Sequence, residues 1–183
     1  MALLVITAII SVGGVLLLQR ERGDTSFPNS PSTSTFLQNP SGSADQRALL
    51  ALVPLAMAKF CQTGGPDAGG IVATVTCDPT DVGDPSSVVL RAYDTAADMN
   101  TAFVAEYGGA APVGDCSTAI GYRSTWQLSG VVQGPLACYQ SKGDEVTVAW
   151  GSTSRAVLAT AGDSTWSADS MYAWWTVHAA WLR

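Results

Sequence analysis

Alternating apolar and polar side chains predict two neighbouring β-strands in the middle of the chain, at residues 71–77 and 87–93. Successive side chains of a strand point to opposite faces, so alternate apolar residues share the face that packs against a core. The segment between them, residues 78–85, is rich in Asp, Pro and Gly, which favour turns. The apolar faces consist of Ile71, Ala73, Val75 and Cys77 in the first strand and Val88, Leu90 and Ala92 in the second.

A second group of strands is predicted nearer the C-terminus. Residues 136–140 and 145–150 are expected to pair across the turn at residues 141–144, and residues 155–160 follow as a third strand. Residues 126–132 offer one further strand. The segment 145–150 shows the clearest alternation of apolar side chains in this group.

The first predicted helix covers residues 44–60 and begins with a capping signal. Ser43 and Gln46 have the spacing of a capping box, in which each side chain binds a free backbone amide of the first turn. Pro54 lies inside this segment and is expected to kink or split the helix, because proline lacks an amide donor and crowds the preceding turn.

Two further helices are predicted, and together with the strands they define the fold class. One begins at a cap on Asp94 and ends before Gly108, and the other begins at a cap on Ser167 and runs towards the C-terminus. The order helix, two strands, helix, strands, helix predicts an α+β fold. We expect a mainly antiparallel sheet of about five strands, with three helices packed on one face.

An uninterrupted apolar segment precedes this domain. Residues 2–18 contain no charged side chain, and seventeen helical residues span about 26 Å, near the lower limit for crossing a bilayer. We expect residues 1–18 to form a transmembrane helix or an uncleaved signal anchor. A cleaved signal peptide and a buried helix remain alternatives, although neither a basic start nor a small-residue cleavage site is clear.

Residues 19–43 are rich in Ser, Thr and Pro and are expected to form a flexible stalk between the anchor and a globular domain at residues 44–183. Arg20 and Arg22 follow the apolar segment, so the positive-inside rule places the C-terminal side in the cytoplasm. The stalk and the cysteines favour the opposite orientation. A natural chain that starts upstream of Met1 with basic residues would remove the conflict.

Composition restricts the partners of the domain. Only 13% of the residues are charged and the net charge is −6, whereas soluble proteins average about 25% charged residues. An acidic surface repels phosphate backbones, so nucleic acid is not an expected partner.

Four cysteines, at positions 61, 77, 116 and 138, allow three disulfide pairings. Sequence separations of 16 and 22 residues suit two local bridges, Cys61–Cys77 and Cys116–Cys138. The absence of a Cys-x-x-Cys motif and the single histidine argue against zinc. Four free thiols in a cytoplasmic protein are the alternative.

Candidate catalytic residues are sparse. His178 is the only histidine, and a catalytic triad would have to draw on Ser164 or Ser170 with Asp163 or Asp169, but no nucleophile-elbow motif is present. We therefore expect His178 to pack on the last helix and the domain to be non-catalytic.

Candidate metal and cofactor sites are weak as well. Asp78, Asp81 and Asp84 lie three residues apart in one loop, and solvated turn acids explain them better than a calcium site. Residues 64–70 are glycine-rich but lack the lysine of a phosphate-binding loop. We expect no metal and no cofactor.

Tryptophan is concentrated near the C-terminus, where Trp166, Trp174, Trp175 and Trp181 occur within sixteen residues. These side chains either pack the last helix onto the sheet or form an exposed aromatic surface for a partner or a glycan polymer. The candidate binding surface consists of Trp174, Trp175 and Trp181.

Several short motifs, taken with the anchor and the stalk, give a resemblance that covers nearly the whole chain. The motifs are Val75-Thr76-Cys77-Asp78-Pro79, Ala102-Phe103-Val104-Ala105-Glu106-Tyr107, Gly114-Asp115-Cys116, Gly134-Pro135-Leu136-Ala137-Cys138-Tyr139, Val148-Ala149-Trp150 and Tyr172-Ala173-Trp174-Trp175. The pattern resembles the extracytoplasmic C-terminal domains of some actinobacterial transmembrane serine/threonine kinases and of related anchored proteins. This resemblance implies two disulfides and an outward-facing sensing or interaction role. It implies no kinase activity here, because the kinase motifs are missing.

These observations predict a single-pass cell-membrane protein whose extracytoplasmic domain senses or binds an unknown ligand or protein. An envelope-associated hydrolase and a secreted structural protein of the cell envelope are the alternatives.

Overall fold

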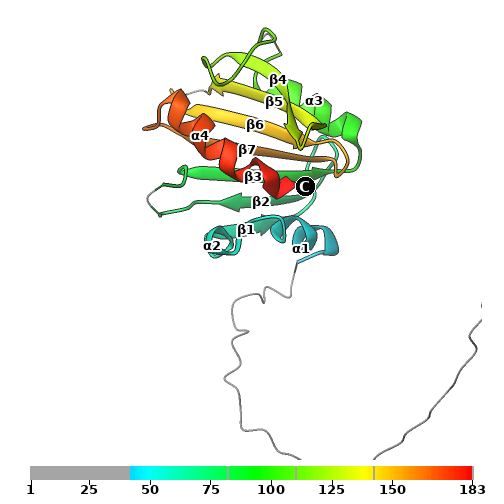
Figure 1. The fold of residues 1–183 in the computed structure, drawn as a ribbon. Coiled ribbons are helices and arrows are strands. Elements are labelled where there is room, and N and C mark those ends of the chain that lie inside the picture. The colour runs from blue at the N-terminus through cyan, green and yellow to red at the C-terminus, as the bar shows by residue number, and fades with distance from the viewer. Residues whose placement is uncertain (1–41, 82, 110, 142, 183) are drawn as a thin grey trace, which may run out of the picture. The chain divides into compact units, whose positions relative to one another are not determined.

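The computed structural model describes residues 42–81, 83–109, 111–141 and 143–182 (Figure 1). The predicted transmembrane helix at residues 1–18 and all but the last two residues of the predicted stalk lie outside this part of the chain. None of the helices in the described residues is long and apolar enough to cross a membrane.

Seven antiparallel strands form a single sheet with the spatial order β1-β2-β3-β7-β6-β5-β4. The α+β class, the antiparallel pairing and the two predicted disulfides are confirmed, but the sheet has seven strands rather than about five. The strands are β1 Cys61–Gly64, β2 Ile71–Cys77, β3 Ser87–Tyr93, β4 Tyr122–Leu128, β5 Val131–Gln140, β6 Val146–Ser152 and β7 Val157–Asp163.

The sheet is built from two runs of strands that are each consecutive along the chain. Strands β1 to β3 form one run and β4 to β7 the other, and they join where β3 pairs with β7 along Ser87↔Gly162 to Ala92↔Val157. Helix α3 (Ala96–Glu106) connects β3 to β4, so the chain crosses from the middle of the sheet to its edge. The two edge strands are therefore β1 and β4.

The predicted first helix is split at proline, as the sequence indicates. Helix α1 (Ala44–Leu50) begins with both hydrogen bonds of the capping box between Ser43 and Gln46. Pro54 is the N-cap of a separate short helix, α2 (Leu55–Ala58).

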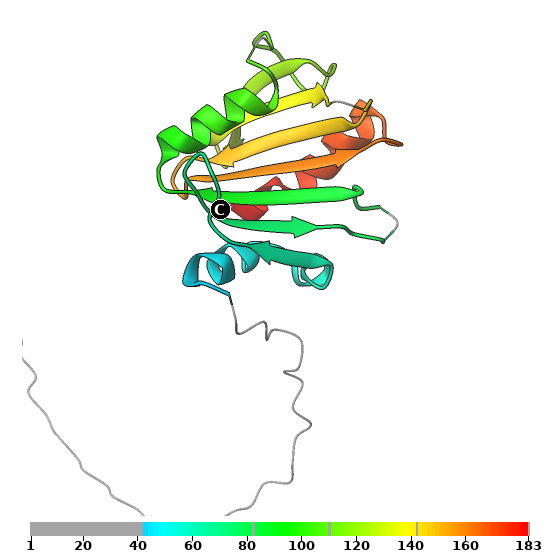
Figure 2. The same ribbon diagram turned by 180° about the vertical axis from the view of Figure 1, so that it is seen from behind.

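Helices cover both faces of the sheet, which corrects the expectation that all three pack on one face. Helix α3 lies on one face, and α4 (Ala168–His178), followed by a 3₁₀ turn at Ala179–Leu182, lies on the other (Figures 1 and 2). On β6, Val148 and Trp150 belong to the core under α4, whereas Ala149 belongs to the core under α3. The strand residues of the core under α3 are Tyr93, Ala137, Ala149 and Leu158.

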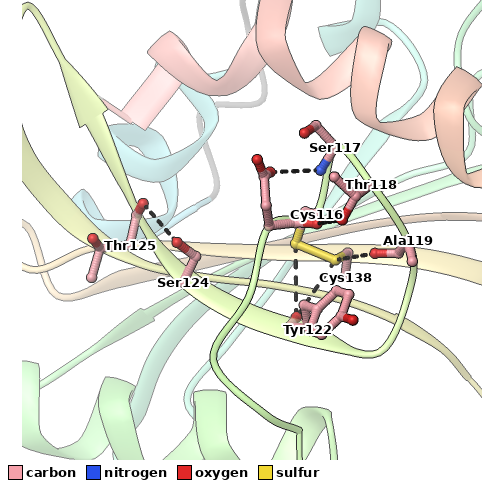
Figure 3. Close-up of a disulfide and its surroundings, with 9 residues drawn as sticks. Cys116, Ser117, Thr118, Ala119, Tyr122, Ser124, Thr125 and Cys138 are labelled. Carbon is pink, nitrogen blue, oxygen red and sulfur yellow. Dashed lines mark hydrogen bonds between the residues drawn. A yellow bond between two sulfur atoms is a disulfide. The ribbon is translucent and has the colours of Figure 1, made fainter.

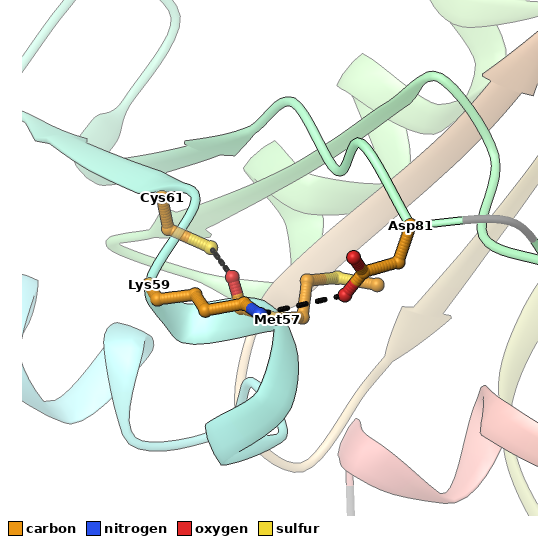
Figure 4. Close-up of polar contacts among 4 residues, drawn as sticks. All are labelled: Met57, Lys59, Cys61 and Asp81. Atoms are coloured by element: carbon orange, nitrogen blue, oxygen red, sulfur yellow. Dashed lines mark hydrogen bonds and ion pairs between the residues drawn. The ribbon is translucent and has the colours of Figure 1, made fainter.

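Both predicted disulfides are present, and each one secures an edge of the sheet. Cys61 and Cys77 lie directly opposite each other in the β1–β2 pair. The Sγ atom of Cys61 also lies 3.3 Å from the carbonyl oxygen of Met57, and nearby Lys59 forms an exposed ion pair with Asp81 (Figure 4). This end of α2 is thereby held against β1 and the loop after β2.

The second disulfide joins Cys116, in the loop before β4, to Cys138 in β5. Its sulfurs lie near the carbonyl oxygen of Tyr122, at 3.7 Å from Cys116 Sγ and 3.5 Å from Cys138 Sγ, and Cys138 Sγ also lies 3.5 Å from the carbonyl oxygen of Ala119 (Figure 3). The bridge fixes this loop over the start of β4.

Candidate functional site

A pocket of about 450 Å³ lies between the edge strand β4 and helix α4, on the face of the sheet that α4 covers. Three aromatic residues line it: Trp126 from β4, and Tyr172 and Trp175 from α4. Leu128 and Leu136 add apolar surface. The disulfide-linked loop contributes Asp115, the one acidic residue in the lining.

The two tryptophans of this pocket differ in how their indole N–H groups are used. Trp126 is buried and donates a hydrogen bond of 2.7 Å from Nε1 to the carbonyl oxygen of Gly151. Trp175 is only 7% exposed and packs against the Tyr172 ring at a centroid distance of 5.3 Å. Its buried Nε1–H has no hydrogen-bond partner among the described residues. Leaving such a group unpaired costs about 1–3 kcal/mol of stability. A ligand that accepted a hydrogen bond from it would remove this cost.

The acidic side of the pocket is held in its ionised form by the local backbone. The side chain of Asp115 accepts a 2.8 Å hydrogen bond from the backbone amide of Ser117, which lowers the pKa of the Asp115 carboxyl. Burial, together with the negative charge of Asp115, raises the pKa of the Tyr172 phenol. Asp115 therefore offers an acceptor to ligand hydroxyl or amine groups, and Tyr172 keeps its proton.

Of the two arrangements considered for Trp174, Trp175 and Trp181, an exposed aromatic surface does not describe the first two residues, which are buried. Trp174 is 6% exposed, contacts the Trp150 ring edge-to-face at 6.3 Å, and donates from Nε1 to Asp84 Oδ1 over 3.1 Å. Trp181 is partly buried against the same core. The alternative of core packing therefore holds for Trp174 and Trp175, although Trp175 also lines the pocket.

Two of the residues considered for a catalytic triad, His178 and Asp163, have structural partners instead. Nδ1 of His178 donates over 2.7 Å to the carbonyl oxygen of Trp174, and its ring stacks on the Trp174 ring at 4.7 Å. Asp163 accepts hydrogen bonds from Ser86 and Thr165 rather than from the histidine. The arrangement does not present a nucleophile next to a base through these residues.

Two of the three loop acids considered for calcium, Asp81 and Asp84, are likewise engaged separately. Asp81 pairs with Lys59 at 3.5 Å, and Asp84 accepts from Trp174. Within the described residues, no group of three or more His, Cys, Asp or Glu side chains is gathered to hold a metal ion.

The pocket combines an apolar aromatic wall with one carboxylate, and one of the tryptophans that line it has an unpaired indole N–H. Sequence reasoning included Trp175 among the candidates but missed Trp126, Tyr172 and Asp115. The resemblance did draw on the Gly114-Asp115-Cys116 and Tyr172–Trp175 motifs, which supply four of the lining residues.

Comparisons of the chain with protein-family models, with curated proteins and with solved structures gave no match. The functional argument therefore depends on the geometry of the described residues.

Proposed function

We propose that this chain is a membrane-anchored, non-catalytic binding or sensing protein, and that its extracytoplasmic domain takes a ligand into the pocket between β4 and α4. The observation that carries the proposal is the buried, unpaired Nε1–H of Trp175 in a side chain that lines this pocket. A ligand that accepts from this atom relieves the cost of leaving it unpaired, which gives binding a specific energetic gain.

The lining indicates what such a ligand carries. An apolar or ring portion packs against Trp126, Tyr172 and Trp175, where aromatic surfaces give large contact area. An acceptor atom reaches Trp175 Nε1, and a hydroxyl or amine donor reaches the carboxylate of Asp115. The ligand class is therefore a small amphipathic molecule with both kinds of polar group.

The outward placement of the domain has separate support. Two disulfides link all four cysteines, and structural disulfides persist in oxidising compartments such as the extracytoplasmic space. Anchoring through residues 1–18 follows from their apolar sequence alone. The resemblance to outward-facing domains of actinobacterial transmembrane kinases carries the same expectation.

Binding is tested with a fragment screen on the full chain labelled with ¹⁵N at tryptophan. We expect hits to shift the indole resonance of Trp175, because hydrogen bonding to Nε1–H changes its environment. The variant Trp175→Phe keeps an aromatic ring but removes the N–H, so hits should bind it at least tenfold more weakly. Trp181→Phe is the matched control, since Trp181 is partly buried on the same C-terminal segment but does not line the pocket. Hits that bind all three proteins equally would reject this pocket.

Placement is tested by non-reducing peptide mass mapping of the native chain extracted from membranes. We expect crosslinked Cys61–Cys77 and Cys116–Cys138 peptides, together with peptides from residues 1–18. Four free thiols in the native chain would place the domain in a reducing compartment and reject the extracytoplasmic role.

A further inference from the structure

A second, smaller pocket of about 130 Å³ lies on the opposite face of the sheet, next to the C-terminal end of α3. Four of its lining residues form one row across neighbouring strands, because Tyr139 pairs with Thr147, Thr147 with Gly162, and Gly162 with Ser87. The row runs through β5, β6, β7 and β3, close to one end of each strand, so the floor of this pocket is made by four neighbouring strands of the sheet.

The floor of this pocket has a depression at Gly162, the one residue of the row that has no side chain. A Cβ atom at Gly162 would lie 2.3 Å from Oε1 of Glu145, so the Glu145 carboxylate occupies the space directly above this glycine. Glu145 precedes β6 and lines the same pocket. A flat floor of larger side chains would leave no room for a carboxylate at this position.

One of the two carboxylates in this pocket lacks a cationic partner among the described residues. Glu106, the last residue of α3, forms a 2.6 Å ion pair with Nη1 of Arg91. Glu145 accepts a 3.1 Å hydrogen bond from the Ser141 hydroxyl, and no described ion pair neutralises it. With Arg91 balancing Glu106, the pocket has one uncompensated negative charge.

A buried hydroxyl gives the second, independent sign of a ligand. Thr147 is 6% exposed, and its Oγ1 has no hydrogen-bond partner among the described residues. Its neighbours in the row, Tyr139 and Gly162, line the pocket with it. Valine has nearly the same shape as threonine and is equally favoured in strands. Compared with valine, an unpaired threonine hydroxyl at this position lowers stability unless a ligand binds it.

We propose that this pocket binds the protonated primary amine of a small ligand. An ammonium group has one positive charge and three N–H donors. Glu145 supplies the opposite charge and one acceptor, Thr147 Oγ1 supplies the second acceptor, and the hydroxyl of Thr160 or Ser87 supplies the third. The site lies on the other face of the sheet from the aromatic pocket, so the inference does not depend on the function proposed above.

The probe is ethylammonium chloride, titrated into the ¹⁵N-labelled full chain at constant ionic strength. We expect saturable shifts of the Thr147 and Gly162 amides with a dissociation constant of about 1–10 mM, as a ligand of three heavy atoms allows. Tetramethylammonium has the same charge but no N–H donor, and should bind at least tenfold more weakly. Absence of saturable shifts at 100 mM ethylammonium, or equal binding of both cations, would overturn the proposal. Stronger shifts of the same amides by calcium chloride would also overturn it and indicate a metal site.

Two variants and one control test which residues contribute to ethylammonium binding. Glu145→Gln should weaken ethylammonium binding at least tenfold, because it removes the opposite charge without changing the shape. Thr147→Val should weaken binding several-fold while leaving the melting temperature unchanged or higher. Asp169→Asn removes an acidic charge at the start of α4, on the other face of the sheet, and should bind as the parent chain does. Unchanged binding in Glu145→Gln would reject the site, and a lower melting temperature in Thr147→Val would show that the hydroxyl has a structural partner and reject its role as an acceptor.

The amine can come from a free small molecule or from a lysine side chain. Nα-acetyl-lysine methylamide separates these sources, since it carries the same ammonium group on a longer stem beside two peptide groups. Tighter binding of this compound than of ethylammonium supports a lysine side chain, and weaker binding supports a free small amine.

Discussion

Three buried side-chain atoms in the described residues lack hydrogen-bond partners: Thr147 Oγ1, Trp150 Nε1 and Trp175 Nε1. They do not have the same meaning. Trp150 is fully buried in the middle of the main core and lines neither pocket, so its N–H is a cost of packing a large ring there. Thr147 and Trp175 each line a pocket. An unpaired atom therefore indicates a ligand here only where there is also room for one.

Asp163 is a buried acidic residue whose hydrogen bonds stabilise the fold. Its carboxylate accepts from the backbone amides of Ser86, Thr165 and Trp166 and from the Thr165 hydroxyl, at 2.7 to 3.2 Å. It thereby ties the end of β7 to the start of β3 and to the turn that leads into α4. Asparagine has one acceptor oxygen fewer, so we expect Asp163→Asn to lower the free energy of unfolding by about 2 kcal/mol, measured by urea denaturation at pH 7.

The same substitution predicts how stability depends on pH. Burial by itself would raise the pKa of Asp163, but the hydrogen bonds from Thr165 and Ser86 outweigh it and lower the pKa below its usual value. A carboxyl whose folded-state pKa is depressed stabilises the protein above its unfolded-state pKa of about 3.9, and this stabilisation is lost as the pH falls through the lower folded-state pKa. The difference between the parent chain and Asp163→Asn should therefore be constant from pH 5 to 8 and narrow below pH 4. Asp144→Asn, at an exposed turn, is the control and should change stability by less than about 0.5 kcal/mol. A difference that stays constant down to pH 2.5 would contradict this assignment.

Strand β5 packs against β6 without room for a side chain at Gly134. A Cβ atom at Gly134 would lie 2.1 Å from the carbonyl oxygen of Gly151 on β6, the oxygen that also accepts from Trp126 Nε1. A backbone atom in the sheet cannot move aside as a flexible side chain can. We expect Gly134→Ala to lower the free energy of unfolding by about 3 kcal/mol or more, through strain and loss of the Trp126 hydrogen bond.

Thermal unfolding followed by circular dichroism measures this effect. Gly64→Ala is a matched control, because a Cβ atom there would meet Thr74 at an ordinary 3.5 Å and the residue lies on the edge strand β1. It should change stability by less than about 1 kcal/mol. Equal melting temperatures for the two variants would show that β5 and β6 can separate freely at this point.

The edge strand β1 is short, and the Cys61–Cys77 disulfide is its main covalent support. It has four residues, and Cys61 is directly opposite Cys77 on β2. Removing a bridge that closes a loop of this length costs about 3 kcal/mol in the chain-entropy model. In the double variant Cys61→Ser/Cys77→Ser, we expect amide exchange in β1 to accelerate more than in β2 or β3. Uniform acceleration across the sheet would show that the bridge stabilises the whole domain rather than its edge.

Pattern reasoning located the inner strands better than the outer ones. Strands β2 and β3 have the predicted bounds because their alternation is regular and their ends are marked by turn residues. Strand β1 was missed because its four residues include a single apolar side chain. The predicted strand at 126–132 is wrong because a turn at Ser129-Gly130, where both residues have positive φ, separates β4 from β5.

The first residues of the helices could be predicted where a single good capping residue was present. Ser43 and Ser167 cap α1 and α4 as predicted. The predicted cap at Asp94 is wrong by one residue, since Thr95 accepts from the amide of Asp98 and begins α3. Adjacent Asp and Thr are both good caps, and only the backbone geometry distinguishes them.

Neither pocket could be predicted from local pattern, and the reason is the topology of the whole molecule. The aromatic pocket joins Trp126 on the edge strand β4 to Trp175 on α4, and the polar pocket joins Ser87 on β3 to Tyr139 on β5. The polar pocket forms only where the two runs of strands join at β3 and β7, and the aromatic pocket forms only when α4 packs back over the second run. Periodicity assigns a residue to a face of its own strand but does not show which distant residue shares that face.

The joining of the two runs also predicts how the whole domain unfolds. The main core cluster includes Val75 and Leu90 from the first run, and Trp150 and Trp174 from the second run and its helix. Neither set has a separate core on this face, so neither run can lose its structure without exposing the apolar surface of the other. We expect the disulfide-intact chain to unfold in urea as a single cooperative transition.

The positions of the tryptophans make this expectation easy to test, because all six lie between residues 126 and 181, within the second run and the C-terminal segment that follows it. Tryptophan fluorescence therefore reports the second run, whereas amide exchange in β2 and β3 reports the first. If the two runs form one folding unit, both probes give the same midpoint, and the Gly134→Ala substitution in β5 lowers both midpoints by the same amount. If the runs are independent, the substitution moves the fluorescence midpoint alone and leaves exchange in β2 unchanged. The second result would mean that the β3–β7 pairing joins two separately stable halves, and that the polar pocket, whose floor crosses this pairing, lies at an interface between them.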